Sequence, residues 1–360
     1  MPGLGLPDDD WLALRREPIL DPGQRLCDPH HHFWDRPVPG AGRFRYLFDE
    51  FLADLLTGHA VIASVAVEAG ALMREGLEPG TMYRTNGPPE LASLGETEFL
   101  HGYGAMAGSG LYCPPGILSG IVAYVDLRLG ARVAELLDRH MAFGRVRGVR
   151  NLTWHHTDPA FAFSDLSIVP GTLATPRFRE GFACLARHDL AYDATAFPHQ
   201  FPELVALARD FPHQRIVLNH LGGILGSGPY AGKREESFAL WREGLRNLAA
   251  CPNVFVKIGG MSAQRGGFAL RDRPEPASSE ELARLWAPYT ETVIALFGPA
   301  RVMFESNYPV ERQFVPYRVL WNAFKRLVSG YTPDERDQML FATAARFYRL
   351  PAVEPVRGGG

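Results

Sequence analysis

The chain has 360 residues, of which 46% are hydrophobic and 21% charged, the composition of an ordinary globular protein. Its formal net charge of −3 excludes the basic surface that nucleic acids or anionic lipids would require. Its apolar runs are too short to span a bilayer, and the N-terminal residues lack the apolar segment of a signal peptide. We therefore expect a cytoplasmic protein that binds neither nucleic acid nor membranes.

Eight short β-rich segments follow one another along the chain, separated by segments with helical periodicity. The predicted strands cover residues 25–33, 60–68, 117–126, 146–153, 191–196, 215–220, 254–258 and 301–306. The predicted helices include residues 131–143, 176–188, 202–210, 237–250, 279–297 and 333–348. Most of these strands are apolar throughout, as strands buried on both faces must be. The alternation predicts parallel pairing through right-handed crossovers and an α/β fold, a (β/α)8 TIM barrel.

We predict one catalytic barrel domain over residues 25–350, preceded by an extension over residues 1–24 and followed by a flexible tail over residues 351–360. Two long insertions are expected, at residues 70–115 after the second strand and residues 261–278 after the seventh. Both leave the carboxyl ends of strands, where barrel enzymes place their active sites. They are either lids over a substrate or contacts within a homo-oligomer.

The first predicted strand ends in Asp28-Pro29-His30-His31-His32. Alternate side chains of a strand share a face, so Asp28, His30 and His32 are expected to point the same way. Two imidazoles two residues apart on one face can bind one metal ion. Consecutive histidines are also common at surfaces and helix caps, so this stretch needs support from the rest of the chain.

Polar residues recur at the carboxyl ends of the other predicted strands, which converge on one axis in a barrel. They are Glu68, Arg150, Asn151, Trp154, His155, Asp193, His199, His220, Lys257, Glu305 and Asn307. Any one has an ordinary explanation: His199 caps a helix, or His220 is a buried core imidazole. Glu68 could likewise pair with Lys257 or Arg150. Burying four imidazoles and two carboxylates together is costly unless a cation organises them, and these ligands suit zinc, manganese or iron(II).

Five motifs resemble the amidohydrolase-related TIM barrels, a family that includes sugar lactonases, dicarboxylate lactonases and aromatic decarboxylases. The motifs are D-P-H-H-H-F-W-D from residue 28, Gly148-Val149-Arg150, Phe197-Pro198-His199-Gln200, Val217-Leu218-Asn219-His220-Leu221-Gly222 and Phe304-Glu305-Ser306-Asn307-Tyr308-Pro309. They occur in the family's order over about residues 26–349, which implies a barrel of the metal-dependent hydrolase type. The resemblance also implies metal ligands at His30, His32 and His199. It makes His220 a further ligand or the catalytic imidazole.

One position departs from the hydrolytic members of this family, which carry an aspartate where this chain has Asn307. In those members the carboxylate binds the metal and takes the proton from the attacking water. An amide cannot be a general base near neutral pH. Glu305 lies two residues earlier, on the same predicted strand face, and could replace the lost ligand. The departure weakens the case for hydrolysis without excluding it.

The sequence E-S-N-Y-P, with Glu68 closing V-A-V-E and G-E-T-E at residues 95–98, is similar to a branch of nonheme diiron monooxygenases. That branch includes the diterpenoid hydroxylases of platensimycin and platencin biosynthesis. The resemblance implies an enzyme of secondary metabolism that hydroxylates a bulky, terpenoid-type acyl substrate, as its coenzyme A thioester, with O₂ and an external reductant. Two iron ions would be held by the four histidines with Glu68 and Glu305. Asn307 would be a further ligand or a hydrogen-bond donor.

Three interpretations remain open. The first is this diiron monooxygenase, with His220, Glu305 and Asn307 as catalytic residues. The second is a metal-dependent hydrolase or lactonase with one zinc or manganese ion, in which His220 or Glu305 replaces the missing aspartate. The third is an inactive barrel that binds a ligand or partner, although a decayed site would not keep so many candidate ligands.

Substrate contacts are expected from residues at the same strand ends. The candidates are Arg150, Trp154, His155 and Lys257. The sequence shows no coenzyme A signature of its own. Four other basic residues could meet phosphates or simply face water; they are Lys233, Arg234, Arg265 and Arg271.

Overall fold

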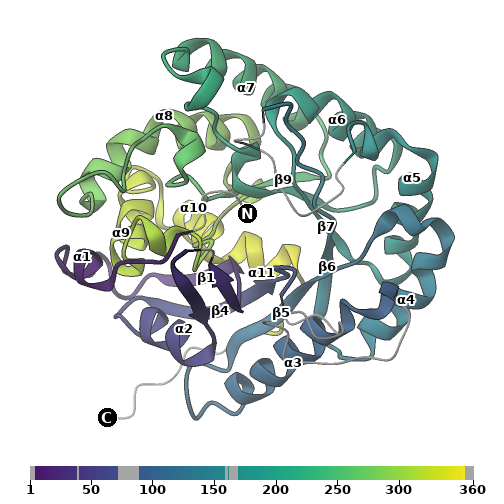
Figure 1. The fold of residues 1–360 in the computed structure, drawn as a ribbon, viewed down its shortest axis with the longest axis horizontal. Helices are drawn as coiled ribbons and strands as arrows, with labels where there is room; N and C mark the ends of the chain where they lie inside the picture. Colours follow the sequence, from purple (N-terminus) through teal and green to yellow (C-terminus); the bar gives the residue numbers. More distant parts are fainter. Residues whose placement is uncertain (1–4, 39, 72–88, 159–160, 162–168, 353–360) are drawn as a thin grey trace.

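The computed structural model describes residues 5–38, 40–71, 89–158, 161 and 169–352 of the chain. Among these residues, eight parallel strands follow one another in chain order around a barrel (Figure 1). The strands are β1 (Arg25–His31), β4 (Ala60–Val67), β5 (Gly116–Tyr124), β6 (Val146–Arg150), β7 (Ala191–Ala194), β8 (Ile216–Leu218), β9 (Val254–Ile258) and β10 (Val302–Phe304). Each overlaps one of the predicted strands, so the predicted TIM barrel is confirmed.

Hydrogen bonds just beyond β10 bring the last strand against the first. Asn307 N donates to His30 O at 2.8 Å, and His32 N donates to Tyr308 O at 2.7 Å. These bonds join the two strands at their carboxyl ends. Residues that are far apart in the sequence, such as His30 and Asn307, therefore become neighbours at one end of the barrel.

Helices surround the strands in Figure 1. They are α2 (Phe48–Leu55), α3 (Leu94–Gly108), α4 (Val133–Met141), α5 (Pro176–Ala183), α6 (Phe201–Asp210), α7 (Arg234–Ala249), α8 (Ser279–Phe297) and α9 (Tyr317–Leu327). The bounds of α8 agree with the prediction because its start has a strong local signal: Ser278 and Glu281 form a capping box. None of the helices in the described part of the chain has the length and apolarity of a membrane span.

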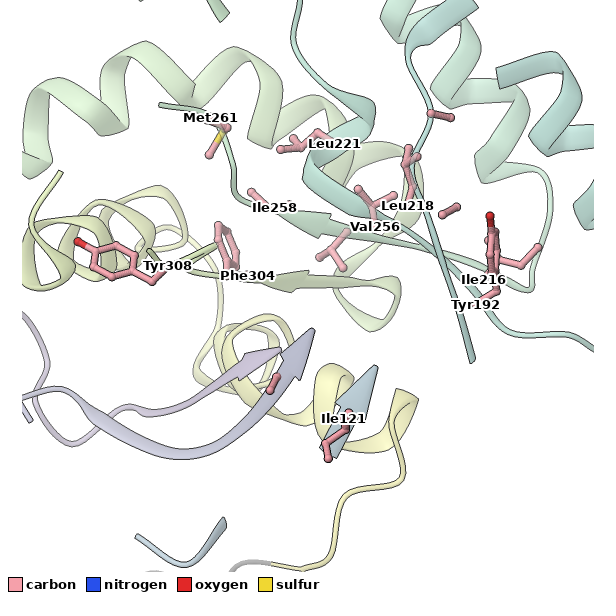
Figure 2. Close-up of a cluster of buried hydrophobic side chains, with 14 of the residues drawn as sticks. Ile121, Tyr192, Ile216, Leu218, Leu221, Val256, Ile258, Met261, Phe304 and Tyr308 are labelled. Atoms are coloured by element: carbon pink, nitrogen blue, oxygen red, sulfur yellow. The ribbon is translucent and has the colours of Figure 1, made fainter. Parts of the chain in front are cut away.

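Strand side chains alternate between two apolar cores. Outward-pointing residues pack between strands and helices; Figure 2 shows Ile216, Leu218, Val256, Ile258 and Phe304 among them. Inward-pointing Val217 and Met303 instead join a cluster with Phe347 and Tyr348 from the end of the chain. That end consists of α10 (Pro333–Asp337), a π-helical turn (Gln338–Ala342) and α11 (Thr343–Phe347). The same alternation places Lys257, which follows Val256, and Glu305, which follows Phe304, inside the barrel.

The structure differs from the prediction in the first third of the barrel. An antiparallel hairpin, β2 (Trp34–Val38) with β3 (Gly42–Tyr46), follows β1 and was not predicted. The insertion expected over residues 70–115 is shorter, because it contains the barrel helix α3; its residues 72–88 lie outside the described residues. Helix α9 was also missed, although its apolar positions follow a helical period.

The N-terminal segment contains a short helix, α1 (Asp9–Ala13), that packs on the connection after β9. Trp11 Nε1 donates to Arg273 O at 3.0 Å, and Arg15 Nη2 donates to Glu275 Oε1 at 2.6 Å. Part of the second predicted insertion is therefore tied to the N-terminal segment. Whether the insertions are lids or oligomer contacts stays a prediction, as does the division into extension, barrel and tail; residues 353–360 lie outside the described residues.

Candidate functional site

The centre of the candidate site is the pair of imidazoles at the end of β1. His30 and His32 are both buried, and their Nε2 atoms lie 3.1 Å apart. A β-bulge follows Asp28, which instead accepts hydrogen bonds from Ser306 N at 2.9 Å and Tyr317 Oη at 3.1 Å. The predicted grouping of His30 with His32 is therefore present, and Asp28 serves to hold the neighbouring chain segments.

The surroundings fix where these two rings carry protons. Val67 O lies 2.8 Å from His32 Nδ1 and can only accept, so Nδ1 is protonated and Nε2 presents a lone pair. Arg150 Nη1 can only donate and lies 3.3 Å from His30 Nε2, so this histidine nitrogen also presents a lone pair. Burial lowers the pKa of His30 and of His32 well below the usual value, so both rings are neutral. Two facing lone pairs repel unless a cation lies against them, so this donor set fits a divalent metal ion.

A second pair is formed by His220, just after β8, and Glu305, just after β10. His220 Nδ1 lies 2.6 Å from Glu305 Oε1, and His220 N donates to the same oxygen at 3.3 Å. Burial lowers the pKa of His220 well below its usual value, and burial raises the pKa of Glu305 to about 7 against the attraction of Lys257. With Nδ1 facing the carboxyl group, Nε2 of His220 is free to accept a proton. A carboxylate orients a catalytic imidazole in this way.

Glu305 also contacts the first pair. Its Oε2 lies 2.7 Å from His30 Nδ1, and His30, His220 and Glu305 form a buried group whose ligand atoms lie within 4.8 Å of one another. Lys257 Nζ lies 3.2 Å from the same His30 nitrogen, but it is farther away than the carboxylate. The lysine can only donate to this nitrogen and the carboxylate can only accept from it, so the two contacts compete. Glu305 lies against both imidazoles, and its hydrogen bond goes to His220.

The end of β9 leaves room for this arrangement. Gly259 and Gly260 follow the strand, and Gly260 has a φ of +63°. A Cβ at Gly260 would lie 2.7 Å from Cγ and Nδ1 of His220, and a Cβ at Gly259 would collide with Glu305. His220 itself has a φ of 54°, which is uncommon for a residue other than glycine. Backbone strain at this point is consistent with a functional site.

Glu68 is held by other partners. Its Oε1 accepts from Arg150 Nε at 2.6 Å, and its Oε2 accepts from Gly70 N at 3.1 Å. Arg150 also donates to the Glu68 carbonyl. The alternative in which Glu68 pairs with Arg150 is therefore the observed one. The described residues do not assemble the four imidazoles and two carboxylates expected for two metal ions.

His199 lies apart from these groups. It is exposed, in the 3-10 turn η6 (Pro198–Gln200), and its ring centroid lies 5.6 Å from that of His156. His155 is half-buried, and its backbone N donates to Gln200 Oε1 at 3.1 Å. Trp154 does reach the site, because its buried ring lies 5.6 Å from the His220 ring. The geometry therefore supports Trp154 as a substrate contact and gives no support to His199 as a ligand, whose role stays a prediction.

Lys257 lies inside the barrel rather than facing a substrate. It is fully buried and donates to Asp193 Oδ2 at 2.7 Å and to Pro29 O at 2.9 Å. Tyr348 Oη donates to the same carboxylate at 2.8 Å. The charge of Lys257 is thus neutralised within the core. Its contacts support the backbone next to His30.

Asn307 is buried beside a second carboxyl group. Burial raises the pKa of Glu311 to about 7, while hydrogen bonds from Ser262 and from the Asn307 side chain act in the opposite direction. An aspartate at this position would place two carboxylates together. A neutral amide at this position avoids that repulsion and interacts favourably with the Glu311 carboxyl group. The sequence alone did not reveal this contact.

Two ionisable residues near the site were not among the predicted site residues. Glu96, from the G-E-T-E segment, is buried and accepts from Ala69 N at 2.8 Å; burial and the charge of Glu68 raise its pKa to about 8. Arg265 lies over the Trp154 ring, 4.8 Å from its centroid. No sequence pattern separates Arg265 from other surface arginines, because its position depends on packing between distant loops.

Comparisons with known proteins point toward hydrolases. A family model described as amidohydrolase matches residues 27–350. The chain is 34% identical over 342 residues to the uncharacterized protein y4mH of Sinorhizobium fredii, covering 90% of this chain and 98% of that protein. It is 27% identical to an L-fucono-1,5-lactonase of Burkholderia multivorans, covering 93% and 99%. A solved amidohydrolase structure from Burkholderia multivorans with bound zinc has a TM-score of 0.64 and 24% identity, covering 91% and 99%.

The predicted diiron monooxygenase is wrong, and with it the oxidoreductase reading and the need for O₂. The curated relatives with functional names are lactonases. The structure gives the physical reason. Both carboxylate oxygens of Glu68 already accept hydrogen bonds, from Arg150 and from Gly70. The Asn307 side chain contacts the Glu311 carboxyl group and is not placed to hold a second iron. The hydrolase or lactonase interpretation agrees better with these findings.

Proposed function

The chain belongs to the amidohydrolase family, and from this premise we propose that it is a metal-dependent hydrolase that opens the ring of a lactone. One observation carries the proposal: the facing Nε2 atoms of His30 and His32 lie next to the His220–Glu305 pair. The first pair suits a metal and the second suits proton transfer, which together are the parts of a metal-assisted hydrolysis. The lactonase names of the curated relatives support a lactone as the substrate class.

His30 and His32 would hold one divalent ion through their Nε2 atoms, with His220 and Glu305 close by. Imidazole nitrogens beside a carboxylate suit zinc or manganese. Bound there, the ion would supply Lewis acidity toward a lactone carbonyl and would lower the pKa of a water molecule. The hydrogen bond from His32 Nδ1 to Val67 O is the kind of outer contact that fixes a ligating imidazole.

His220 replaces the missing aspartate as the proton acceptor. Its Nε2 takes a proton from water as the water oxygen bonds to the carbonyl carbon. The same nitrogen then returns the proton to the ring oxygen as the carbon–oxygen bond breaks, giving a hydroxy acid. Glu305 keeps Nδ1 protonated throughout and stabilises the imidazolium that forms. Burial keeps the pKa of His220 low, so the ring starts neutral.

The proposal is tested by assaying aldono-1,5- and aldono-1,4-lactones under nitrogen, using protein loaded with zinc or manganese. We expect ring opening without O₂, lost on chelation and restored by adding the metal. Protein that needs O₂ for turnover, or metal-loaded protein that opens neither these lactones nor the matching aldarolactones, would overturn the proposal. His188→Ala is the matched control, because His188 pairs with Asp138 on the surface at 2.7 Å and should leave both metal content and rate unchanged.

A further inference from the structure

Arg265 extends toward the site from the connection between β9 and α8. Its backbone carbonyl accepts hydrogen bonds from Gly226 N at 2.8 Å and Ser227 Oγ at 3.3 Å, which fix the turn η9 (Gln264–Gly266). Its guanidinium carbon lies 4.8 Å from the centroid of the Trp154 ring. Since Trp154 also contacts the His220 ring, this stack places the cation beside the proposed base.

This guanidinium has no partner among the described residues. No described side chain or carbonyl accepts a hydrogen bond from it, and no described carboxylate lies within ion-pair distance of 4.0 Å. The neighbouring Arg234 is different, because it donates to Tyr289 Oη and to Gly266 O, each at 3.0 Å. Arg265 is half-buried, so its stacked face is shielded while its hydrogen-bonding edge makes no bond to a described residue.

The electrostatics agree with a position inside the site. After burial, the charge of Arg265 is the strongest influence that lowers the pKa of His220. Burial lowers the pKa of Arg265 itself, and the Glu311 carboxyl group acts in the opposite direction from beyond ion-pair distance. A positive group with unused donors therefore stands next to the place where a lactone would be attacked.

We propose that Arg265 binds a carboxylate on the substrate, so that the lactone opened by this enzyme is an anionic one. The inference rests on the proposed function and narrows its substrate class. An arginine fork matches two carboxylate oxygens, and the Trp154 ring holds the fork in plane. A phosphate is less suited, because there is one unpaired guanidinium here and the Glu311 carboxyl group opposes a second negative charge.

The test compares two lactones that differ by one group. D-galactono-1,4-lactone carries a terminal hydroxymethyl group where D-galactaro-1,4-lactone carries a carboxylate. We expect kcat/KM to be higher for the carboxylate compound. Arg265→Gln should lower that value by about 10- to 100-fold, mainly through KM, since a charge-assisted bidentate contact is lost. The neutral lactone should lose clearly less, because it forms no charged contact with Arg265, and Arg265→Lys should recover part of the loss on the carboxylate compound.

Arg271→Gln is the matched control. Arg271 lies in the same connection and also covers a tryptophan, Trp11, at 4.8 Å, but it pairs with Asp8 at 3.5 Å. It should leave both lactones unaffected. Equal losses on both lactones with Arg265→Gln would show that Arg265 is structural, and a neutral preference in the native enzyme would also overturn the proposal.

Direct binding separates this inference from the proposed function. Tetrahydrofuran-2-carboxylate and tetrahydrofurfuryl alcohol have the same ring, cannot be hydrolysed as lactones, and differ in charge. Calorimetry on metal-loaded enzyme should show that the carboxylate binds more tightly and that Arg265→Gln removes the difference. If the enzyme opens lactones but this difference is missing, the inference alone fails. If inorganic phosphate competes through Arg265 and the carboxylate does not, the ligand is a phosphate and the inference is wrong.

Discussion

Glu305 Oε1 and His220 Nδ1 lie 2.6 Å apart although the two residues are 85 positions apart in the sequence. They follow β10 and β8, which flank β9 in the sheet. The contact across β9 is possible because that strand ends in Gly259 and Gly260, where side chains would collide with the pair. The two glycines are therefore as much part of the site as the groups that carry protons.

Replacing Glu305 tests whether this pair transfers protons. Glu305→Gln keeps the shape of the side chain but removes the charge that stabilises the His220 imidazolium. We expect kcat to fall by about 10²- to 10⁴-fold with a smaller change in KM, because the general base His220 loses the carboxylate that orients it and stabilises its charged form. Metal content should be measured in parallel. A variant that keeps full metal content and full kcat would show that the His220–Glu305 pair does not transfer protons in the reaction.

Gly260→Ala tests whether the His220–Glu305 pair needs the space that a glycine leaves at this position. The φ of +63° disfavours alanine, at a cost of about 1–2 kcal/mol, and the new Cβ would push the His220 ring away from Glu305. Gly298→Ala is a suitable control because Gly298 has a similar φ of +73° but nothing within 4 Å of the added Cβ. Both variants should lose stability in urea, because each places alanine at a positive φ. Only Gly260→Ala should lower kcat, and equal activity of the two variants would contradict the role given to Gly260.

His32→Ala and His199→Ala test which histidines hold the metal. The family resemblance implies that both do, whereas the structure supports His32 alone. His32 is buried with its Nε2 facing His30, whereas His199 is exposed. We expect His32→Ala to lose bound zinc or manganese while the chain stays folded, and His199→Ala to keep it. Metal analysis of both proteins after dialysis gives the answer. Metal loss in His199→Ala alone would show that the exposed histidine moves into the site on binding.

Asn307→Asp should not raise the rate of hydrolysis. The new carboxylate would stand beside Glu311, whose buried carboxyl group now accepts a hydrogen bond from the Asn307 amide. Loss of that donor and the repulsion between two acids should cost about 1–3 kcal/mol of stability. The double change Asn307→Asp with Glu311→Gln should recover most of it. A rate gain of tenfold or more in the single variant would mean that the family aspartate is the base and that His220 is not.

The sequence predicted the barrel, and it predicted that His30 and His32 lie together, for a physical reason. Alternation within one strand is local, so the joint placement of His30 and His32 could be read from a five-residue stretch. The bounds of β9 and α8 were also predicted correctly, because apolar runs and capping boxes are local signals. What depended on contacts between distant segments could not be read in this way.

The surroundings of three other residues depend on such distant contacts. Glu68 looked like a metal ligand until the structure placed Arg150 against it at 2.6 Å. Asn307 suggested different chemistry because its neighbour Glu311, four residues later, seemed unrelated to it. Arg265 was one basic residue among several, and only the packing of its loop on Trp154 distinguishes it. The role of each residue depends on a neighbouring side chain that the fold, and not the sequence order, places beside it.

The pH dependence of stability should have a contribution from His140, which lies outside the site. Its ring is buried between α4 and α3 and lies 2.9 Å from Thr97 Oγ1 and 3.2 Å from Ser93 Oγ. Burial lowers its pKa from 6.5 to about 4, so the unfolded chain binds a proton before the folded one does. The contribution of His140 to the free energy of unfolding is complete above pH 6.5 and is lost as the pH falls toward 4, by about 3 kcal/mol in all and about 2 kcal/mol at pH 5.

His140→Gln removes the proton site, so its urea unfolding free energy should approach or exceed that of the native chain as the pH falls from 7.5 to 5. The other buried histidines titrate in both proteins and cancel in the difference, so parallel curves would show that the His140 ring is not held neutral by its surroundings.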